Sequence, residues 1–203
     1  MKSAILLLTA VLSLSACKEK KQEGPGETIP VTETASPADD STAIRKQILD
    51  FYSWYTTHYE KLMGYQLYKG EKKNDQPPYQ INWEEVERYQ AFIRDSIPYL
   101  GDGFLANQRT MLKQCDSAFK ASPEDEIPYG FDYDWYTNSQ EDASYLLKGL
   151  ETSGKWIIQV KGDEAFVEIG APDSKDYLSG SLLLFVGMKK ENGIWTINRI
   201  GND

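Results

Sequence analysis

The fold of this chain is decided by a stretch that reads KWIIQVKGDEAFVEI over residues 155–169. On both sides of the Gly162-Asp163 pair every second side chain is apolar, which is the spacing of strands with one buried face. A glycine followed by an aspartate at this point favours a two-residue hairpin turn. The stretch therefore predicts two antiparallel strands joined by a tight turn.

Two further strands are expected after this hairpin. Residues 182–188 are apolar at nearly every position, as in an inner strand that is covered on both faces. Asn192-Gly193 is a strong signal for a type I′ turn, and it leads into a closing strand over residues 194–200. The C-terminal part of the chain is therefore predicted to be a four-stranded antiparallel sheet.

Before residue 155 the apolar spacing is helical. Residues 41–63 carry apolar and aromatic side chains three or four positions apart, with Asp40 or Ser41 as the N-cap. Three shorter helices are expected between residues 82 and 154. Their capping signals are, in chain order, Asn82 with Glu85, then Asp102, and then Ser139 with Asp142.

Between the first two helices, residues 64–81 contain two glycines and two prolines and are interpreted as a long loop with room for a short element. Helices first and strands afterwards predict an α+β domain over residues 41–203, with three to four helices packed on one face of the sheet. Cys115 lies on the apolar stripe of the third helix, so we expect a buried thiol that behaves as a small hydrophobe.

The N-terminus carries the features of a lipoprotein signal peptide. A cationic start is followed by an apolar run over residues 4–14, which is too short to span a bilayer as a helix. The run ends in Leu-Ser-Ala-Cys, the pattern of a bacterial lipobox, which predicts cleavage after residue 16 and a lipid on Cys17. Lys18 in place of aspartate favours the outer membrane. Residues 17–40 are rich in Pro, Gly, Thr and Glu and are predicted to be a disordered tether.

Composition excludes several functions. The 203 residues carry a formal net charge of −9, which argues against a nucleic-acid partner, because phosphate binding needs clustered cations. His58 is the sole histidine, so no centre that needs two imidazoles can form. Acidic residues gather over residues 124–142, but without the glycine and glutamate spacing of a calcium loop. We therefore expect no metal and no cofactor.

Three segments resemble the YbjP-like family of uncharacterised bacterial lipoproteins. They are Asp-Phe-Tyr-Ser-Trp-Tyr at residues 50–55, the hairpin over residues 155–169, and Gly-Ile-Trp-Thr-Ile at residues 193–197. The resemblance runs over residues 44–200 and implies a cystatin-like, nuclear-transport-factor-like cone, in which a curved sheet wraps around helices. Because the shared motifs are aromatic and structural, the resemblance carries over no catalytic residue.

An aromatic surface is the candidate binding site. The residues proposed to meet a ligand or partner are Trp54, Tyr55, His58, Tyr59 and Tyr177. Aromatic side chains of this kind offer a large contact area with a polar tip. The loops over residues 64–81 and 171–180 are long connections on a rigid scaffold, and we expect partner contacts there as well.

Two functions are consistent with these features. The first is a non-catalytic envelope lipoprotein that binds a protein or a small ligand, as an assembly stabiliser or a hydrolase inhibitor of the immunity type. The alternative is a cavity enzyme, an isomerase or cyclase, that pairs Asp116, Asp132 or Asp134 with a tyrosine. The enzyme requires a buried carboxylate in a deep pocket, whereas the binding module does not.

Overall fold

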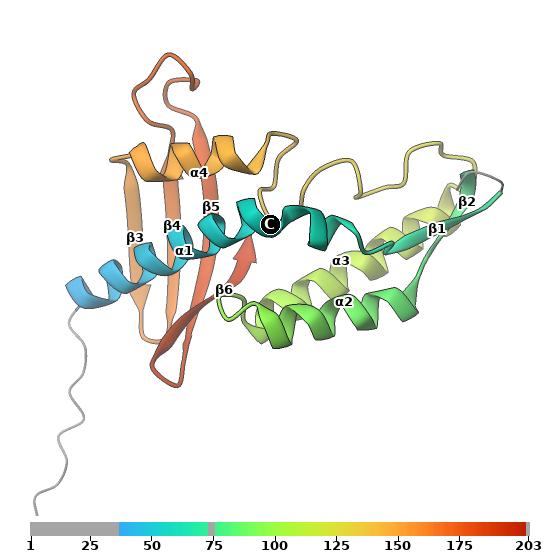
Figure 1. Cartoon of the computed structure of the whole chain (residues 1–203), viewed down its shortest axis with the longest axis horizontal. Helices are drawn as coiled ribbons and strands as arrows, with labels where there is room; N and C mark the ends of the chain where they lie inside the picture. The colour runs from blue at the N-terminus through green and yellow to red at the C-terminus, as the bar shows by residue number, and fades with distance from the viewer. Residues whose placement is uncertain (1–36, 73–75, 202–203) are drawn as a thin grey trace, which may run out of the picture. The chain divides into compact units, whose positions relative to one another are not determined.

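The computed structural model describes residues 37–72 and 76–201, and its C-terminal strands form the predicted antiparallel sheet (Figure 1). β3 (Trp156–Lys161) pairs with β4 (Glu164–Gly170), so the hairpin around Gly162-Asp163 is confirmed. β5 (Leu182–Glu191) and β6 (Ile194–Ile200) follow, and the strand order is β3-β4-β5-β6. The predicted signal peptide, Cys17 and most of the predicted tether lie outside the described residues.

Four helices of the described part precede the sheet in the chain. They are α1 (Pro37–Met63), α2 (Trp83–Ser96), α3 (Asp102–Ala121) and α4 (Ala143–Thr152). The α+β class, with helices packed against a four-stranded antiparallel sheet, is confirmed. α1 begins at Pro37, inside the range predicted as tether, because Asp39 and Asp40 favour the positive end of a helix dipole.

Asp40 has a different role from the predicted cap. Asp40 and Ser41 both lie inside α1, so neither is its N-cap. The Asp40 carboxylate instead accepts hydrogen bonds from Lys190 Nζ at 2.6 Å and Trp195 Nε1 at 2.9 Å. These two bonds, that from Lys190 first, lower the pKa of Asp40. They fasten the start of α1 to the hairpin of β5 and β6.

The other capping predictions are only partly right. Asn82 occupies the N-cap of α2, but its backbone is not extended and its side chain makes no capping hydrogen bond. Gly101, rather than Asp102, is the N-cap of α3, which leaves the Asp102 carboxylate in the first helical turn. Asp142 alone caps α4, while Ser139 lies four residues before the first residue of the helix and accepts a hydrogen bond from the N–H of Glu141 in the loop.

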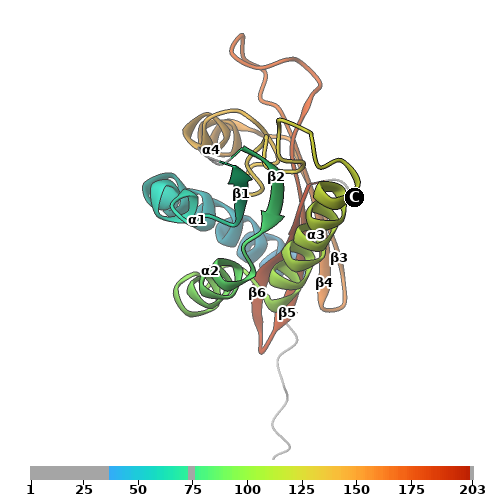
Figure 2. The same ribbon diagram turned by 90° about the vertical axis from the view of Figure 1, so that its right-hand side faces the viewer.

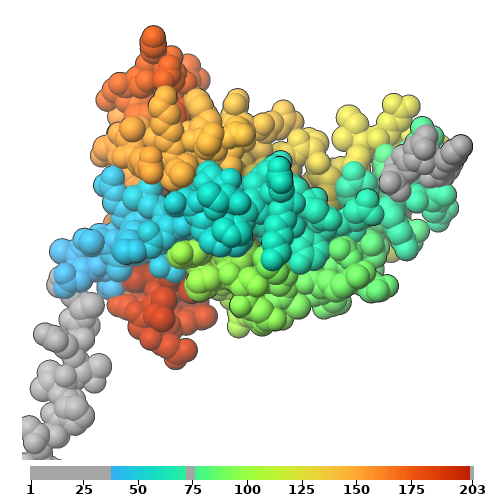
Figure 3. Space-filling model, viewed as in Figure 1, coloured from blue at the N-terminus to red at the C-terminus, as the bar shows by residue number. Residues whose placement is uncertain are grey.

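The helices cover one face of the sheet. In Figure 2, α1, α2 and α4 lie on the same side of the strands, and α1 and α4 are in contact along the face shown in Figure 3. Val167 is buried under this layer, whereas Phe166 points to the other face and is 43% exposed. The prediction that β5 is covered by other elements on both faces is therefore wrong. On the face away from the helices, the Phe185 ring of β5 is covered by the Arg199 guanidinium, 5.2 Å away.

The segment predicted as a loop over residues 64–81 contains a second hairpin. β1 (Tyr68–Lys72) pairs with β2 (Gln76–Ile81), and β2 packs against α3. Pro77 and Pro78 are typical of loops, which is why the pattern was not that of a strand. A two-stranded sheet tolerates them because each of its strands is an edge.

The two edges of the four-stranded sheet differ. Residues 99–101, between α2 and α3, run alongside β6: Gly101 N donates to Ile197 O at 2.9 Å, and Ile197 N donates to Tyr99 O at 2.8 Å. Within residues 37–72 and 76–201, no backbone pairs with the outer side of β3. β3 is therefore an open edge strand.

The core lies between the helices and the sheet and is rich in aromatic rings. Phe51, Tyr52 and Tyr55 of α1 are fully buried, and the rings of Phe51 and Tyr55 contact Tyr136 from the connection between α3 and α4. Cys115 is buried as predicted, and burial raises the pKa of its thiol to about 11. No helix in the described part of the chain is long and apolar enough to cross a membrane.

Candidate functional site

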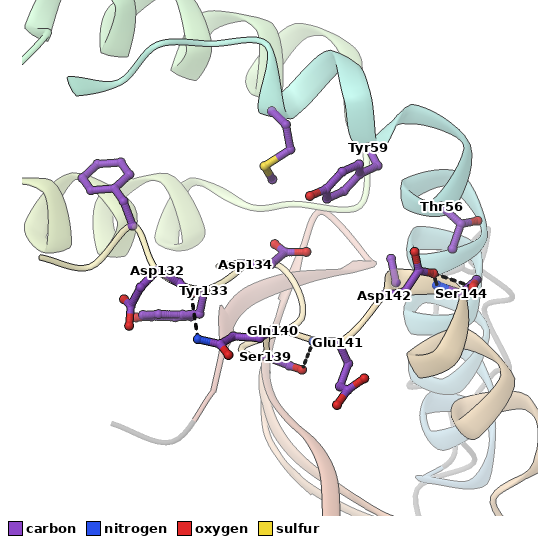
Figure 4. A pocket seen from close by; sticks show the side chains of 13 residues that line it. Thr56, Tyr59, Asp132, Tyr133, Asp134, Ser139, Gln140, Glu141, Asp142 and Ser144 are labelled. Carbon is purple, nitrogen blue, oxygen red and sulfur yellow. Dashed lines mark hydrogen bonds between the residues drawn. The ribbon is translucent and has the colours of Figure 1, made fainter. Parts of the chain in front are cut away.

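A cleft opens between the C-terminal half of α1 and the connection from α3 to α4 (Figure 4). Its volume is about 600 Å³. One wall comes from α1, the floor from residues 131–134 and the other wall from residues 139–144. The residues that line it are Thr56, Tyr59, Met63, Phe131, Asp132, Tyr133, Asp134, Ser139, Gln140, Glu141, Asp142, Ala143 and Ser144.

Asp134 holds the floor of the cleft in place. Its Oδ2 accepts a hydrogen bond from Tyr55 Oη at 2.7 Å, and its Oδ1 accepts one from Tyr136 N at 2.8 Å. Its backbone N–H donates to Ser139 O at 2.9 Å, which closes the loop on itself. Both carboxylate oxygens are thus engaged by the protein, and the loop is fixed to α1.

Burial sets the protonation of this pair. Burial raises the pKa of Asp134, although the hydrogen bonds from Tyr55 and Tyr136 favour its charged form. Burial and the neighbouring carboxylate also raise the pKa of Tyr55, so this phenol keeps its proton. The neutral Tyr55 hydroxyl therefore donates to the partly desolvated carboxyl of Asp134, and its proton does not point into the cleft.

A chain of buried hydrogen bonds continues behind Asp134. Tyr52 Oη donates to Tyr136 O at 2.6 Å, and the hydroxyls of Tyr136 and Tyr89 lie 2.5 Å apart. Gln108 Nε2 donates to Tyr89 Oη at 3.0 Å. This network joins α1, α2 and α3 to the floor of the cleft, and it makes the floor a rigid support.

The mouth of the cleft is acidic. Figure 4 shows Tyr59 on α1 across from Asp134, with Glu141 on one side of the connecting segment and Asp132 on the other, beside Tyr133. Asp142 is held ionised, since hydrogen bonds from Ser144 lower its pKa. None of the described residues that line the cleft is Lys, Arg or His. The negative charge at the mouth is therefore not balanced by a cation in its own walls.

An aromatic pocket adjoins the cleft. It has a volume of about 310 Å³ and shares Met63, Phe131 and Tyr133 with the cleft. The remaining residues that line it are Leu62, Tyr65, Gln66, Leu67, Tyr68, Tyr89, Trp135 and Tyr136. Tyr59 and Met63, at the boundary, are 42% and 45% exposed. A ligand in the acidic cleft would therefore also contact apolar and aromatic surface.

The structure separates the five residues predicted to form the aromatic surface. Tyr59 lines the cleft, as a binding residue should. Trp54 and His58 stack on each other, with ring centroids 4.3 Å apart, on a flank of α1 outside the cleft walls. Tyr55 is buried in the core, and Tyr177 is buried against Tyr145, so the prediction that these two rings face a partner is wrong.

The carboxylates proposed for an enzyme are also separated. Asp116 lies on α3, pairs with Lys120 at 2.6 Å and is not among the residues that line the cleft. Asp132 and Asp134 both line the cleft, but only Asp134 contacts a tyrosine hydroxyl. Among the described residues, no three His, Cys, Asp or Glu side chains converge as metal ligands would.

The sequence did not predict that residues 131–134 form the floor of a cleft. The alternation of aromatic and acidic residues over residues 131–136 is short and lies among the polar residues 124–142, so the segment reads as a polar loop. Its signal is the interleaving of Asp132 and Asp134 with large aromatic residues, which fill the other four of the six positions. Such rings need burial, and their burial draws the intervening carboxylate of Asp134 inward.

Comparison with known proteins adds one weak likeness. No family model matches the chain, and no curated protein matches it. A solved structure that aligns with it is the crystal structure of the type VI effector-immunity complex Tae3-Tai3 from Ralstonia pickettii. The identity is 14%, the match covers 78% of this chain and 95% of that chain, and the TM-score is 0.38. A TM-score this low does not establish a common fold, and the resemblance to YbjP-like lipoproteins stays a prediction.

Proposed function

We propose that this chain is a non-catalytic binding module of the bacterial cell envelope, anchored by a lipid on Cys17, that engages a basic partner protein through the acidic cleft. The observation that carries the proposal is the cleft itself. Carboxylates from Asp132, Glu141 and Asp142 surround it, aromatic surface adjoins it, and no described lining residue carries a positive charge.

This chemistry fits a lysine or arginine side chain. The cationic head would lie between Asp132 and Glu141, and a charge-assisted hydrogen bond to a carboxylate is among the stronger polar contacts. The aliphatic stem would pack on Tyr59 and Met63, and a ring face attracts a cation by about 0.5–2 kcal/mol. The net charge of −9 would steer a basic partner toward the chain.

A hydrolase of the cell wall is the partner class that we favour, with the chain acting as its inhibitor or as a stabiliser of an envelope assembly. Such enzymes act on an anionic polymer, so a basic surface is expected of them. Occupation of that surface by an acidic module would compete with the polymer. The rigid support under the cleft favours this role, because a preorganised site loses less entropy on binding.

The experiment places a photo-crosslinking amino acid at Tyr59 in intact cells, with the same group at the exposed Glu151 as the control position. We expect a protein partner to be captured from Tyr59 only. Substitution of Asp132→Lys together with Glu141→Lys should abolish that capture, while Glu151→Lys should leave it unchanged. Capture that survives the double reversal would contradict a cleft-mediated interaction.

The lipid anchor has its own test. Cells grown with an alkyne fatty acid should label the wild-type chain, and the label should be absent from Cys17→Ser. The wild-type chain should sediment with outer membranes, and the variant should not. A labelled Cys17→Ser chain, or an unlabelled wild type, would refute the anchor without bearing on the cleft.

An isomerase or cyclase is the second candidate, and one observation favours it: a carboxylate with a raised pKa, Asp134, lies in the cleft beside a tyrosine. Against it, Tyr55 donates to Asp134 itself, whereas catalysis of this kind needs the donor and the base to face the substrate. Incubation with a metabolite extract, followed by chromatographic separation and mass spectrometry, distinguishes the two functions, since an isomerised product has the mass of its substrate. A compound that wild type consumes and Asp134→Asn does not would establish the enzyme.

A further inference from the structure

We propose that the open edge of β3 is a second docking surface, distinct from the cleft, which receives an acidic extended segment of a protein partner as an added antiparallel or parallel strand. β3 is the left-hand strand of the sheet in Figure 1. The opposite edge is covered, because residues 99–101 bond to β6. The molecule therefore offers one free edge in the described part of its sheet.

The register of the hairpin shows which backbone groups this edge presents. Lys161 and Glu164 flank a two-residue turn, so they form a hydrogen-bonded pair, and the pattern alternates from there. Ile157 and Gln159 consequently bond to β4. The N–H and C=O groups of Trp156, Ile158 and Val160 point outward, where an added strand would meet them.

A groove runs beside this edge. It has a volume of about 660 Å³ and lies between the N-terminal half of α1 and β3. Leu49, Trp156 and Ile158 supply apolar wall, and alternate side chains of an added strand would enter it. The complete lining is Ser41, Thr42, Arg45, Lys46, Leu49, Asp50, Trp156 and Ile158.

The charge of the groove selects the occupant. Among the residues that line the groove, Asp50 is already paired with Lys46, so the net positive charge comes from the Arg45 guanidinium. This guanidinium lies 4.7 Å from the centre of the Trp156 ring. Trp156 Nε1 is buried without a hydrogen-bond partner among the described residues. A carboxylate of the added strand would pair with the Arg45 guanidinium, as the Asp40 carboxylate pairs with Lys190 beside Trp195 elsewhere in the same fold.

A second copy of the chain fits this edge poorly. Antiparallel self-pairing centred on Ile158 would pair the largest number of outward groups, and it would place Lys155 of one copy opposite Lys161 of the other. Like charges directly opposite each other in a sheet are destabilising. In the monomer these lysines face Asp173, at 2.6 Å, and Glu164, across the hairpin. An acidic strand meets no such repulsion from them.

The test uses the full-length chain in mild detergent and a fluorescein-labelled peptide of about eight alternating Glu and Val residues, enough to span the edge. Fluorescence anisotropy should report binding, and a peptide with Lys in place of each Glu should not bind. Amide hydrogen exchange should slow at Trp156, Ile158 and Val160 when the acidic peptide is added. Amides of Ile157 and Gln159, already bonded to β4, should change little.

Two variants probe different parts of the surface. Ile158→Pro removes an outward N–H that the sheet does not use, and Arg45→Glu reverses the charge of the groove; each should weaken peptide binding at least about tenfold. Lys113→Glu, an equal charge change on the exposed side of α3, should leave it unchanged. If Ile158→Pro lowers the melting temperature strongly, the proposal is still tested by the peptide affinity of Arg45→Glu and by the amide hydrogen exchange of the wild-type chain.

Three outcomes would overturn the proposal. The first is equal binding of the acidic and the basic peptide. The second is binding without protection of the outward amides. The third is a dimer by light scattering that Ile158→Pro dissociates and the acidic peptide does not, which would assign the edge to a second copy. None of these results bears on the cleft, whose partner is captured through Tyr59.

Discussion

At the residue scale, Asp134 contributes to the stability of the fold and also lines the acidic cleft. Its carboxylate accepts from Tyr55 and from the backbone of Tyr136, and burial raises its pKa. The folded state therefore binds a proton on the Asp134 carboxyl more tightly than the unfolded state does. The charged carboxylate therefore lowers the stability of the fold at neutral pH, and this cost disappears as the pH falls from above the raised pKa to below the ordinary carboxyl pKa of 3.8.

Substitution of Asp134→Asn tests this linkage. The amide can accept from only one of the two donors, and a buried donor left without a partner costs about 1–3 kcal/mol. Because the wild-type carboxyl gains stability on protonation and the amide does not, the loss should be larger at about pH 4 than at pH 7. Urea unfolding at both pH values measures it, and a loss that shrinks on acidification would contradict the raised pKa.

Cys115 provides a second prediction at this scale. Its thiol is buried and has a pKa of about 11, so little thiolate forms at neutral pH. We expect slow labelling by a thiol reagent in the native protein and fast labelling in urea. Gly130, at φ +80°, would place an added Cβ 2.7 Å from Cys115 Sγ, so Gly130→Ala should speed labelling by loosening this contact. Immediate labelling of the native wild type would show that the thiol is accessible.

At the scale of elements, α1 depends on a polar contact with the far end of the chain. Lys190 and Trp195 both donate to Asp40, and these bonds lower its pKa. The stabilisation is fully present above the ordinary aspartate pKa of 3.8 and is lost as the pH falls through the lower pKa of the folded state. Asp40→Ala should lower the melting temperature at pH 7, and the difference from wild type should vanish in stronger acid.

Glu60→Ala, on the exposed side of the same helix, is the matched control for Asp40→Ala and should leave the melting temperature nearly unchanged. Equal effects of the two substitutions would mean that α1 responds to its own charge and not to the bonds from Lys190 and Trp195. Retention of the Asp40→Ala effect in strong acid would contradict the ionised pairing.

The elements also show what sequence can and cannot predict. The hairpin at Gly162-Asp163 was predictable because period, turn chemistry and burial agree there. The hairpin of β1 and β2 was not, since Pro77 and Pro78 give no strand signal and its stability comes from packing on α3. The cleft escaped prediction for the same reason: Asp134 and Tyr55 are 79 positions apart, and only tertiary packing brings them together.

At the scale of the whole molecule, the net charge of −9 is unevenly distributed. The cleft holds carboxylates without a cation among its described lining residues, whereas Arg45 and Lys46 lie in the groove beside β3. Partner association through the cleft should therefore slow with added salt, because exposed charges are screened beyond about 8 Å at physiological ionic strength. Stopped-flow association of the captured partner over a salt series measures this, and a rate independent of salt would exclude electrostatic steering.

The hydrogen bonds between residues 99–101 and β6 limit how many chains can assemble through this sheet. A sheet that can accept strands at both edges can join chain after chain into a fibre. Here one edge is closed by the protein's own backbone, so copies of this chain cannot join edge to edge into a repeating sheet. Complexes built on this sheet are therefore expected to be finite rather than fibrous.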